Sequence, residues 1–467
     1  MKFSNTVLLS IMTALTSTVS AGCSYEGGNY FCSEVSAVTY QNVGYSGTYK
    51  DVTNMDESSC QCTQESVSFS GTNSPLDEEL SVHFRGPVKL LQFAVYSGSS
   101  SSSSKKVKRD ENDCTTTKHV HHAHKREAAT AIVQVTETVY VNAQGEKLTS
   151  SGTQTIVTNA APTTGETTTL ESSPAAGNTA WSSSPVNDDT TTAEATPTSS
   201  QSSSSTKASS TQTSATASST ATSGDWTRSS YYTPGSVDNV VFLNTLGGTD
   251  SGVWSSCFGN SLSYAGSDGT STSSSAVALG EVTLGSDDEY VIFSGASCND
   301  GNDGCGYYRE GIPAYHGFGG SEKIFLFEFE MPHDSSSSGA SNPDMPAIWL
   351  LNAKIPRTLQ YGDSTCSCWS TGCGELDLFE ILAEGDERLI SHLHDGQGKD
   401  GTSTGGTGSQ DYFARPTSSS MKAAVVFSAD KTISIVQLDD STDFSSALDA
   451  STVSKWLSTS GSTAYLS

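Results

Sequence analysis

The sequence predicts an all-β protein whose C-terminal part, residues 225–467, forms a jelly-roll β-sandwich. Short runs of β-branched and aromatic residues recur there between turn signals rich in Gly, Asn, Asp and Ser. No helical periodicity of comparable length competes with them. The segment also has a length typical of one all-β sandwich, about 200–250 residues. We therefore expect two packed antiparallel sheets.

The expected strands alternate apolar and polar residues or are apolar throughout. In the N-terminal part they are residues 80–84 and 90–96, separated by a Gly-Pro break. In the C-terminal part they are residues 240–243, 290–293, 323–331, 347–351, 375–382, 423–427 and 432–436.

Residues 1–21 have the features of a signal peptide. Lys2 supplies a positive start, residues 7–12 begin a short apolar run, and Val19-Ser20-Ala21 offers small residues for cleavage. The run is too short to span a bilayer comfortably. We expect a secreted, extracellular protein without a membrane anchor, because no later stretch is apolar enough for a transmembrane helix or a lipid-anchor signal.

Residues 22–97 are expected to form a small β module tied by disulfides. Eleven cysteines fit an oxidising compartment, and zinc is the less favoured alternative because the ligand spacings do not match. Two even-numbered groups could each pair internally, although the connectivity stays open, and Cys114 is left over. The groups are Cys23, Cys32, Cys60 and Cys62, and Cys257, Cys298, Cys305, Cys366, Cys368 and Cys373.

Two polar segments separate this module from the sandwich. Residues 98–147 form a basic, His-containing spacer in which Lys125-Arg126, followed by Glu-Ala, resembles a site cut by fungal kexin-type proteases; an ordinary solvated charge cluster is the alternative. Residues 148–224 are dominated by Ser, Thr, Ala, Gly and Pro. Such a composition cannot bury enough apolar surface to fold, so we expect a disordered, O-glycosylated linker.

The charge balance restricts the partners. The 467 residues contain 24 Lys and Arg against 51 Asp and Glu, a net charge of −27. Nucleic acids and anionic membranes repel so negative a surface, whereas a neutral polysaccharide does not. We expect no nucleic-acid partner, no cofactor and no metal ion.

Three carboxylates stand in one apolar, strand-forming segment, residues 374–382. On a regular strand Glu375 and Asp377 share a face, and Phe379 would follow them there. A one-residue bulge at Leu378-Phe379 would return Glu380 to the acidic face. The three acids would then line one surface.

Such a row suits glycoside hydrolysis with retention, which uses one carboxylate as nucleophile and another as general acid/base. Like charges placed together raise the pKa of at least one carboxyl, which would keep the acid/base protonated. Two alternatives remain open on spacing alone: an exposed edge strand with outward acids, and a calcium site.

The motif Glu-x-Asp-x-x-Glu after Gly374 resembles the active-site strand of glycoside hydrolase family 16, in the bulged form of its endo-β-1,3-glucanases. Residues 345–351 resemble the family's Pro-Ala-x-Trp-Leu-Leu segment, and residues 325–332 resemble the strand before it. The whole chain resembles the fungal cell-wall proteins known as "target of SBF". The resemblance implies a concanavalin-like or glucanase-like sandwich.

The resemblance also implies roles for single residues. Glu375 would be the nucleophile, Asp377 its assistant and Glu380 the acid/base. Trp369 lies six residues before Glu375, one more than in most of the family, and three cysteines nearby are unusual, so this loop departs from the pattern. Trp349 would stack on a sugar ring, with an ordinary core tryptophan as the alternative. The expected substrate-binding residues are Trp349, Trp369, His392 and His394, the histidines lying on one face of the next strand.

We therefore expect a glycosidase of the cell wall that cleaves β-1,3-glucan with retention. A β-glucan transglycosylase would pass through the same covalent intermediate. A non-catalytic glucan-binding wall protein is the alternative from a different class.

Overall fold

The computed structural model describes residues 22–26, 29–98, 225–298, 304–336, 339–397 and 405–466. The predicted signal peptide, the dibasic site, Cys114 and nearly all of the predicted spacer and linker lie outside these residues.

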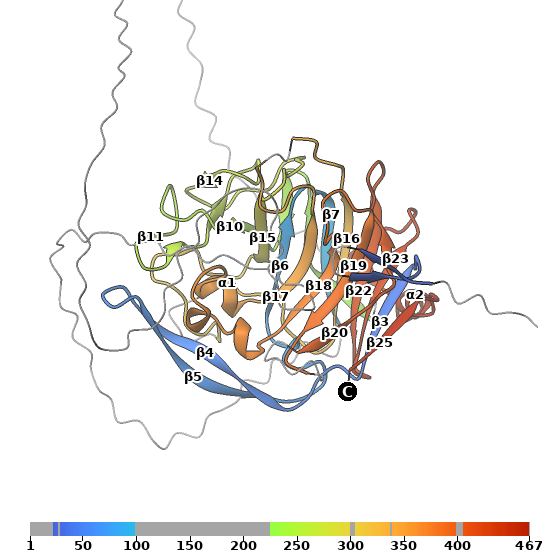
Figure 1. Ribbon diagram of the computed structural model, residues 1–467, viewed down its shortest axis with the longest axis horizontal. Helices are drawn as coiled ribbons and strands as arrows, with labels where there is room; N and C mark the ends of the chain where they lie inside the picture. The colour runs from blue at the N-terminus through green and yellow to red at the C-terminus, as the bar shows by residue number, and fades with distance from the viewer. Residues whose placement is uncertain are drawn as a thin grey trace, which may run out of the picture. The chain divides into compact units, whose positions relative to one another are not determined.

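Two large sheets make up the fold, which confirms the all-β prediction (Figure 1). The first has the order β14-β13-β10-β15-β6-β17-β18-β19-β20, with β21 beside β19. Its strands are β14 (Thr272–Ser273), β13 (Ser263–Ala265), β10 (Val240–Asn244), β15 (Glu289–Ser294), β6 (Leu80–Arg85), β17 (Ala347–Asn352), β18 (Glu375–Glu380), β19 (Arg388–His394), β20 (Gly406–Gly408) and β21 (Phe413–Ala414).

The second sheet has the order β24-β8-β7-β16-β22-β23-β3-β25, with β9 beside β8, and only its β25–β3 pair is parallel among the described strand pairs. Its strands are β24 (Ala447–Leu448), β8 (Trp226–Thr233), β7 (Lys89–Gly98), β16 (Lys323–Glu330), β22 (Met421–Ser428), β23 (Thr432–Leu438), β3 (Ala37–Gln41), β25 (Ser462–Tyr465) and β9 (Ser236–Asp238).

The main core lies between the sheets. Alternate residues of each strand point inward, so Phe84 of β6 meets Phe327 of β16, with ring centroids 6.3 Å apart. Ile348 of β17 and Val425 of β22 belong to the same buried cluster. The predicted β-sandwich is therefore present, and every strand expected from the sequence lies in one of its sheets.

The N-terminal strands stand in the middle of both sheets. Strand β6 pairs with β15 on one side and β17 on the other, and β7 pairs with β8 and β16 (Figure 1). The expectation that residues 22–97 form a module of their own is therefore wrong. Strand β6 is buried along nearly its whole length, and a strand buried in this way needs a hydrogen-bonded neighbour at each edge.

A long hairpin, β4 (Gly47–Asp56) with β5 (Gln61–Phe69), runs outside the two sheets on the side of helix α1 (Lys354–Thr358) (Figure 1). The sequence patterns did not predict it. Its polar residues alternate with only a few buried ones, because one of its faces is open to solvent. Smaller hairpins join β1 (Ser24–Glu26) to β2 (Asn29–Phe31) and β11 (Trp254–Ser255) to β12 (Gly259–Asn260).

The disulfides connect the two halves of the chain, so the proposed pairing within each cysteine group is wrong for four cysteines. The interhalf bonds are Cys60–Cys257 and Cys62–Cys366, and both come from hairpin β4–β5. The local bonds are Cys23–Cys32, Cys298–Cys305 and Cys368–Cys373. Although Cys60 and Cys62 are only two residues apart, they bond to cysteines in different segments of the C-terminal half.

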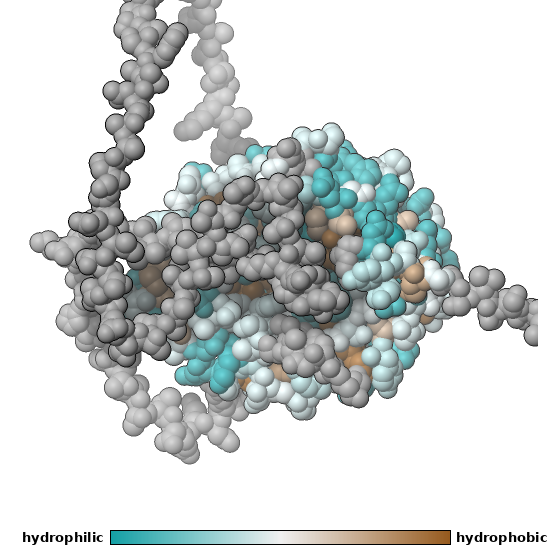
Figure 2. Space-filling model, in the orientation of Figure 1, coloured by the Kyte–Doolittle hydropathy of each residue, from teal (hydrophilic) through white to brown (hydrophobic). Residues whose placement is uncertain are grey.

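Helix α2 (Ala450–Leu457) covers the outer face of the second sheet. Val453 and Trp456 are buried in a cluster with Ile324 and Leu326 of β16. Neither described helix has the length and apolar character that a membrane span requires. The face shown in Figure 2 is mostly hydrophilic where residues are coloured, with small hydrophobic areas between.

A cut within residues 99–224, at Lys125-Arg126 or by an added protease, should leave the two chain pieces together. Non-reducing denaturing electrophoresis should show one species and reducing electrophoresis two, because two disulfides join the pieces. In a double variant, Cys60→Ser with Cys62→Ser, the two pieces of the cut chain should separate under denaturing conditions. They should still migrate together on a native gel, because the strands of the two pieces remain paired. Dissociation of the cut wild-type protein without reductant would contradict this pairing.

Candidate active site

Strand β18 carries the predicted bulge. Phe379 faces Ile348 of β17, and Asp377 faces the next residue, Trp349, so Leu378 has no partner in the register. The pairing with β19 shifts at the same place. Leu378 and Phe379 are both fully buried in the core between the sheets. Two consecutive inward residues return Glu380 to the outward face, which confirms the expectation from the sequence.

The three carboxylates line one cavity of about 300 Å³ on the outer face of the first sheet. The cavity combines strands from both halves of the chain, since β6 lies beside β17 and β17 beside β18. Its lining residues are Arg85, Ala347, Trp349, Leu351, Ile355, Gln360, Tyr361, Trp369, Glu375, Asp377 and Glu380.

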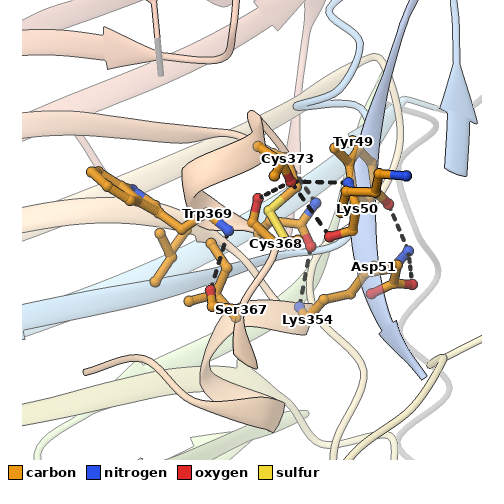
Figure 3. The surroundings of a disulfide bond; sticks show 12 residues. Tyr49, Lys50, Asp51, Lys354, Ser367, Cys368, Trp369 and Cys373 are labelled. Carbon is orange, nitrogen blue, oxygen red and sulfur yellow. Dashed lines mark hydrogen bonds and ion pairs between the residues drawn. A yellow bond between two sulfur atoms is a disulfide. The ribbon is translucent and has the colours of Figure 1, made fainter. Parts of the chain in front are cut away.

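Glu375 accepts a hydrogen bond from the indole N–H of Trp369. Trp369 opens the short 3-10 helix η2 (Trp369–Thr371) and is 40% exposed. The disulfide Cys368–Cys373 closes the loop that carries it (Figure 3). In that view the indole extends away from the disulfide. Although the loop departs from the family spacing, its tryptophan reaches the first carboxylate.

Asp377 lies beside a histidine of the neighbouring strand. His394 of β19 places Nε2 3.4 Å from the Asp377 carboxylate. His392 faces Asp377 in the strand register and stacks on His394, with ring centroids 4.4 Å apart. Neither predicted histidine lines the cavity itself, and both lie on β19 beside the strand that carries the acids.

Glu380 lies beside Arg85, the last residue of β6. The guanidinium Nη2 is 3.4 Å from the Glu380 carboxylate, and its Nε donates to the Met345 carbonyl at 3.0 Å. The sequence analysis missed Arg85, because no local spacing relates it to an acid 295 residues away. The only available signal was a basic residue at the end of an apolar strand.

Trp349 is buried like a core tryptophan and also lines the cavity. It is only 6% exposed and stacks on the buried His83 ring at 5.0 Å, as a core tryptophan would. It nevertheless belongs to the residues that line the cavity. His83 is held by Ser81 and Glu289 through hydrogen bonds of 2.9 and 3.2 Å.

The opposite wall comes from the segment after α1. The Gln360 amide and the Tyr361 hydroxyl both donate to Glu289, at 2.7 and 2.6 Å. Glu289 thus joins this wall to the histidine beneath Trp349. The sequence analysis did not single out Gln360 or Tyr361, which stand in a loop without a recognisable motif.

Burial is the main cause of the raised carboxyl pKa values. It raises the pKa of Glu375 to about 8, and the neighbouring Asp377 charge adds to the effect. Burial also raises the pKa of Asp377 and of Glu380, while Arg85 opposes both shifts. Like-charge crowding, expected from the sequence as the cause, is the second contribution to the raised pKa of Glu375 and of Asp377. The row therefore holds at least one proton at mildly acidic pH.

Among the described residues, the side chains with metal-ligand spacing are Cys298, Cys305 and His316. The two sulfurs form a disulfide, and metals bind thiolates instead. In the acidic row the nearest partners are a guanidinium, an imidazole and an indole N–H, which are donors for carboxylates.

The fold and cleft define a β-sandwich protein with a glycosidase-like carboxylate site. The chain belongs to the Tos1/YJL171C family of fungal cell wall proteins. The family's C-terminal model, described as "Cell wall protein YJL171C/Tos1, C-terminal", matches residues 224–456. Its N-terminal model matches residues 36–98.

Similar proteins span the whole chain. A Candida albicans protein named "Probable circularly permuted 1,3-beta-glucanase TOS1" is 56% identical over 100% of both chains. A Saccharomyces cerevisiae protein of the same name is 54% identical over 100% of this chain and 99% of its own. A Schizosaccharomyces pombe relative, also named a probable circularly permuted 1,3-beta-glucanase, is 43% identical over 96% and 95%. No solved structure matches the chain.

The Glu375→Gln variant should be more stable than the wild type at neutral pH. The pKa of Glu375 is raised in the folded protein from 4.5 to about 8, so the unfolded chain ionises first and the free energy of unfolding falls as pH rises between these values. Removing the carboxyl group should raise the free energy of unfolding by about 1–3 kcal/mol near pH 8 and leave it unchanged near pH 4. Urea unfolding at both pH values measures this.

The matched control is Glu384→Gln, at an exposed glutamate outside the cavity. It should leave the pH dependence of the unfolding free energy unchanged. A stability gain for Glu375→Gln that is equal at pH 4 and pH 8 would contradict the role of the carboxyl proton.

Proposed function

We propose that this protein is a secreted, extracellular cell-wall glycoside hydrolase that cleaves β-1,3-glucan with net retention. The observation that carries the proposal is the row Glu375, Asp377 and Glu380 on one bulged strand, facing one cavity beside two tryptophans. The relatives named as probable 1,3-beta-glucanases support the substrate class.

In the first step, the ionised Glu375 carboxylate attacks the anomeric carbon of the bound sugar. The bond from that carbon to the leaving oxygen breaks, and Glu380 gives its proton to this oxygen. The indole N–H of Trp369 holds Glu375 and favours its ionised form. The product is a covalent glycosyl-enzyme and a shortened glucan with a free hydroxyl.

In the second step, the ionised Glu380 takes a proton from a water molecule, and the oxygen of that water attacks the anomeric carbon. The ester bond to Glu375 breaks, and two inversions give net retention. A glucan hydroxyl in place of water would give transglycosylation. Product analysis by chain length separates these outcomes, because only transfer produces chains longer than the substrate.

The neighbours of the carboxylates fit these roles. Arg85 keeps the pKa of Glu380 from rising as far as burial alone would raise it, which suits a group that must both give and take a proton. His394 Nε2 lies 3.4 Å from the Asp377 carboxylate, so the neighbouring strand holds this acid between the two glutamates. Trp349 and Trp369 offer apolar faces for sugar rings.

Reducing ends released from laminarin test the assignment. Glu375→Gln should reduce activity below detection, because no covalent intermediate can form. Glu380→Gln should lower kcat by about 10²–10⁴-fold through loss of acid catalysis. An inactive wild type that still binds glucan would favour the non-catalytic wall protein instead.

Azide rescue on an activated aryl β-glucoside substrate separates the two glutamates. Glu375→Gly with azide should release an α-glycosyl azide after a single inversion, and Glu380→Gly with azide a β-glycosyl azide. Glu384→Gly, at an exposed acid, should retain activity and form no azide product. Exchanged product configurations would reverse the roles of Glu375 and Glu380.

The Arg85→Gln variant should extend activity to higher pH. Loss of the guanidinium lets the pKa of Glu380 rise further, so the acid stays protonated longer and the basic limb of kcat/KM moves up by about 0.5–1 pH unit. The Arg388→Gln variant, changed at an arginine paired with Glu26 and Asp386 outside the cavity, is the control. A basic limb that stays or moves to lower pH would refute this role of Arg85.

A further inference from the structure

Hairpin β4–β5 is hydrogen-bonded to the segment that carries Trp369. The Lys50 N–H of β4 donates to the Thr371 hydroxyl oxygen at 2.9 Å, and this hydroxyl lies 2.9 Å from the Cys368 carbonyl. From β5, the Gln64 amide donates to the Ser367 carbonyl at 3.0 Å. The hairpin thus contacts the loop at Thr371 and, directly before the loop, at Ser367. Figure 3 shows Lys50 of β4 beside the Cys368–Cys373 disulfide.

Two disulfides further restrain the loop that carries Trp369. Cys62–Cys366 joins β5 to η1 (Ser364–Cys366), directly before the loop. Cys368–Cys373 closes the loop itself across five positions. Inside it, the Gly372 N–H donates to the Trp369 carbonyl at 3.0 Å. These covalent and hydrogen-bonded restraints leave the backbone of Trp369 little freedom.

The hairpin is in turn fixed to the rest of the protein. Lys354 of α1 donates to the Tyr49 hydroxyl at 2.6 Å and pairs with Asp51 at 2.9 Å (Figure 3). The Tyr49 hydroxyl donates to Glu78 at 2.8 Å. The part of β4 that contacts the loop is therefore also bonded to helix α1. The chain continues from α1 into the cavity wall at Gln360 and Tyr361.

We propose that hairpin β4–β5 positions Trp369 against Glu375, with Thr371 as the positioning residue at their contact. The proposal rests on the proposed function, because it assigns the hairpin to the nucleophile of that reaction. Thr371 is not among the residues that line the cavity, and it shares the short helix η2 with Trp369. It acts through Trp369, whose indole N–H is the group that bonds Glu375.

The acid limb of the pH profile of kcat/KM reports on the hydrogen bond between Trp369 and Glu375, because this limb follows the ionisation of the nucleophile. The charged groups that face Glu375 are Asp377 and Glu380 on its own strand and His394 on β19. None of them is changed by the variants below. Loss of the indole hydrogen bond raises the pKa of Glu375, so the acid limb should move to higher pH.

The experiment compares the acid limb of laminarin hydrolysis in the wild type and five variants of the full chain. Trp369→Phe should shift the limb up by about one pH unit. Thr371→Val should shift it up by about half a unit, and Thr371→Ser, which keeps the hydroxyl, should restore the wild-type limb. Thr53→Val removes a hydroxyl that bonds Thr63 within the same hairpin and should shift nothing.

The decisive form is the double variant Trp369→Phe with Thr371→Val. If Thr371 acts through Trp369, the double variant should have the same acid limb as Trp369→Phe alone. Additive shifts, or a Thr371→Val variant that loses thermal stability with an unmoved limb, would overturn the proposal.

A second readout does not depend on activity. The fluorescence of Trp369, taken as the difference between each form and its Trp369→Phe counterpart, should change with pH as the bonded Glu375 carboxyl ionises. Thr371→Val should move that midpoint upward, and an unmoved midpoint would overturn the positioning role. If the wild type hydrolyses no glucan while the midpoint still moves, the proposed function fails and the positioning role stands.

Discussion

The pairing of β6 between β15 and β17 is the constraint on which the rest of the structure depends. This single strand closes the first sheet at its centre, places Phe84 in the core between the sheets and sets Arg85 beside Glu380. Without it the first sheet would have two unpaired interior edges, whose backbone groups would lie buried without partners. The fold and the cleft are therefore products of the same strand, although the segments that form them are far apart in the chain.

Three carboxylates in one half-buried cleft oppose folding, and their neighbours reduce that penalty. Arg85, His394 and the Trp369 indole each approach a different acid. The cleft still retains carboxyls with raised pKa values, since these three donors offset desolvation only in part. Such a residual instability is typical of sites in which reactive groups are held in place by the surrounding fold.

Local patterns in the sequence predicted the strands and the bulge, because alternation and burial act over a few residues. The run Leu378-Phe379 between acids was sufficient to predict where the bulge lies, and the strand register confirms it. Long-range pairings had no local signal. The sequence could not show that β6 enters a sheet built by later strands, that Cys62 reaches Cys366, or that Arg85 meets Glu380. The predicted site residues were found from a motif, and the missed ones belong to other segments.

The central place of β6 also sets an order of events during synthesis. Its neighbours are β15 and β17, and the end of β17 is 267 residues after the end of β6. At ribosomal rates of about 5–20 residues per second, β6 waits some tens of seconds for its partners to be made. During that interval the apolar residues 80–85 stay without their strand partners, so they are open to a chaperone that binds extended apolar segments.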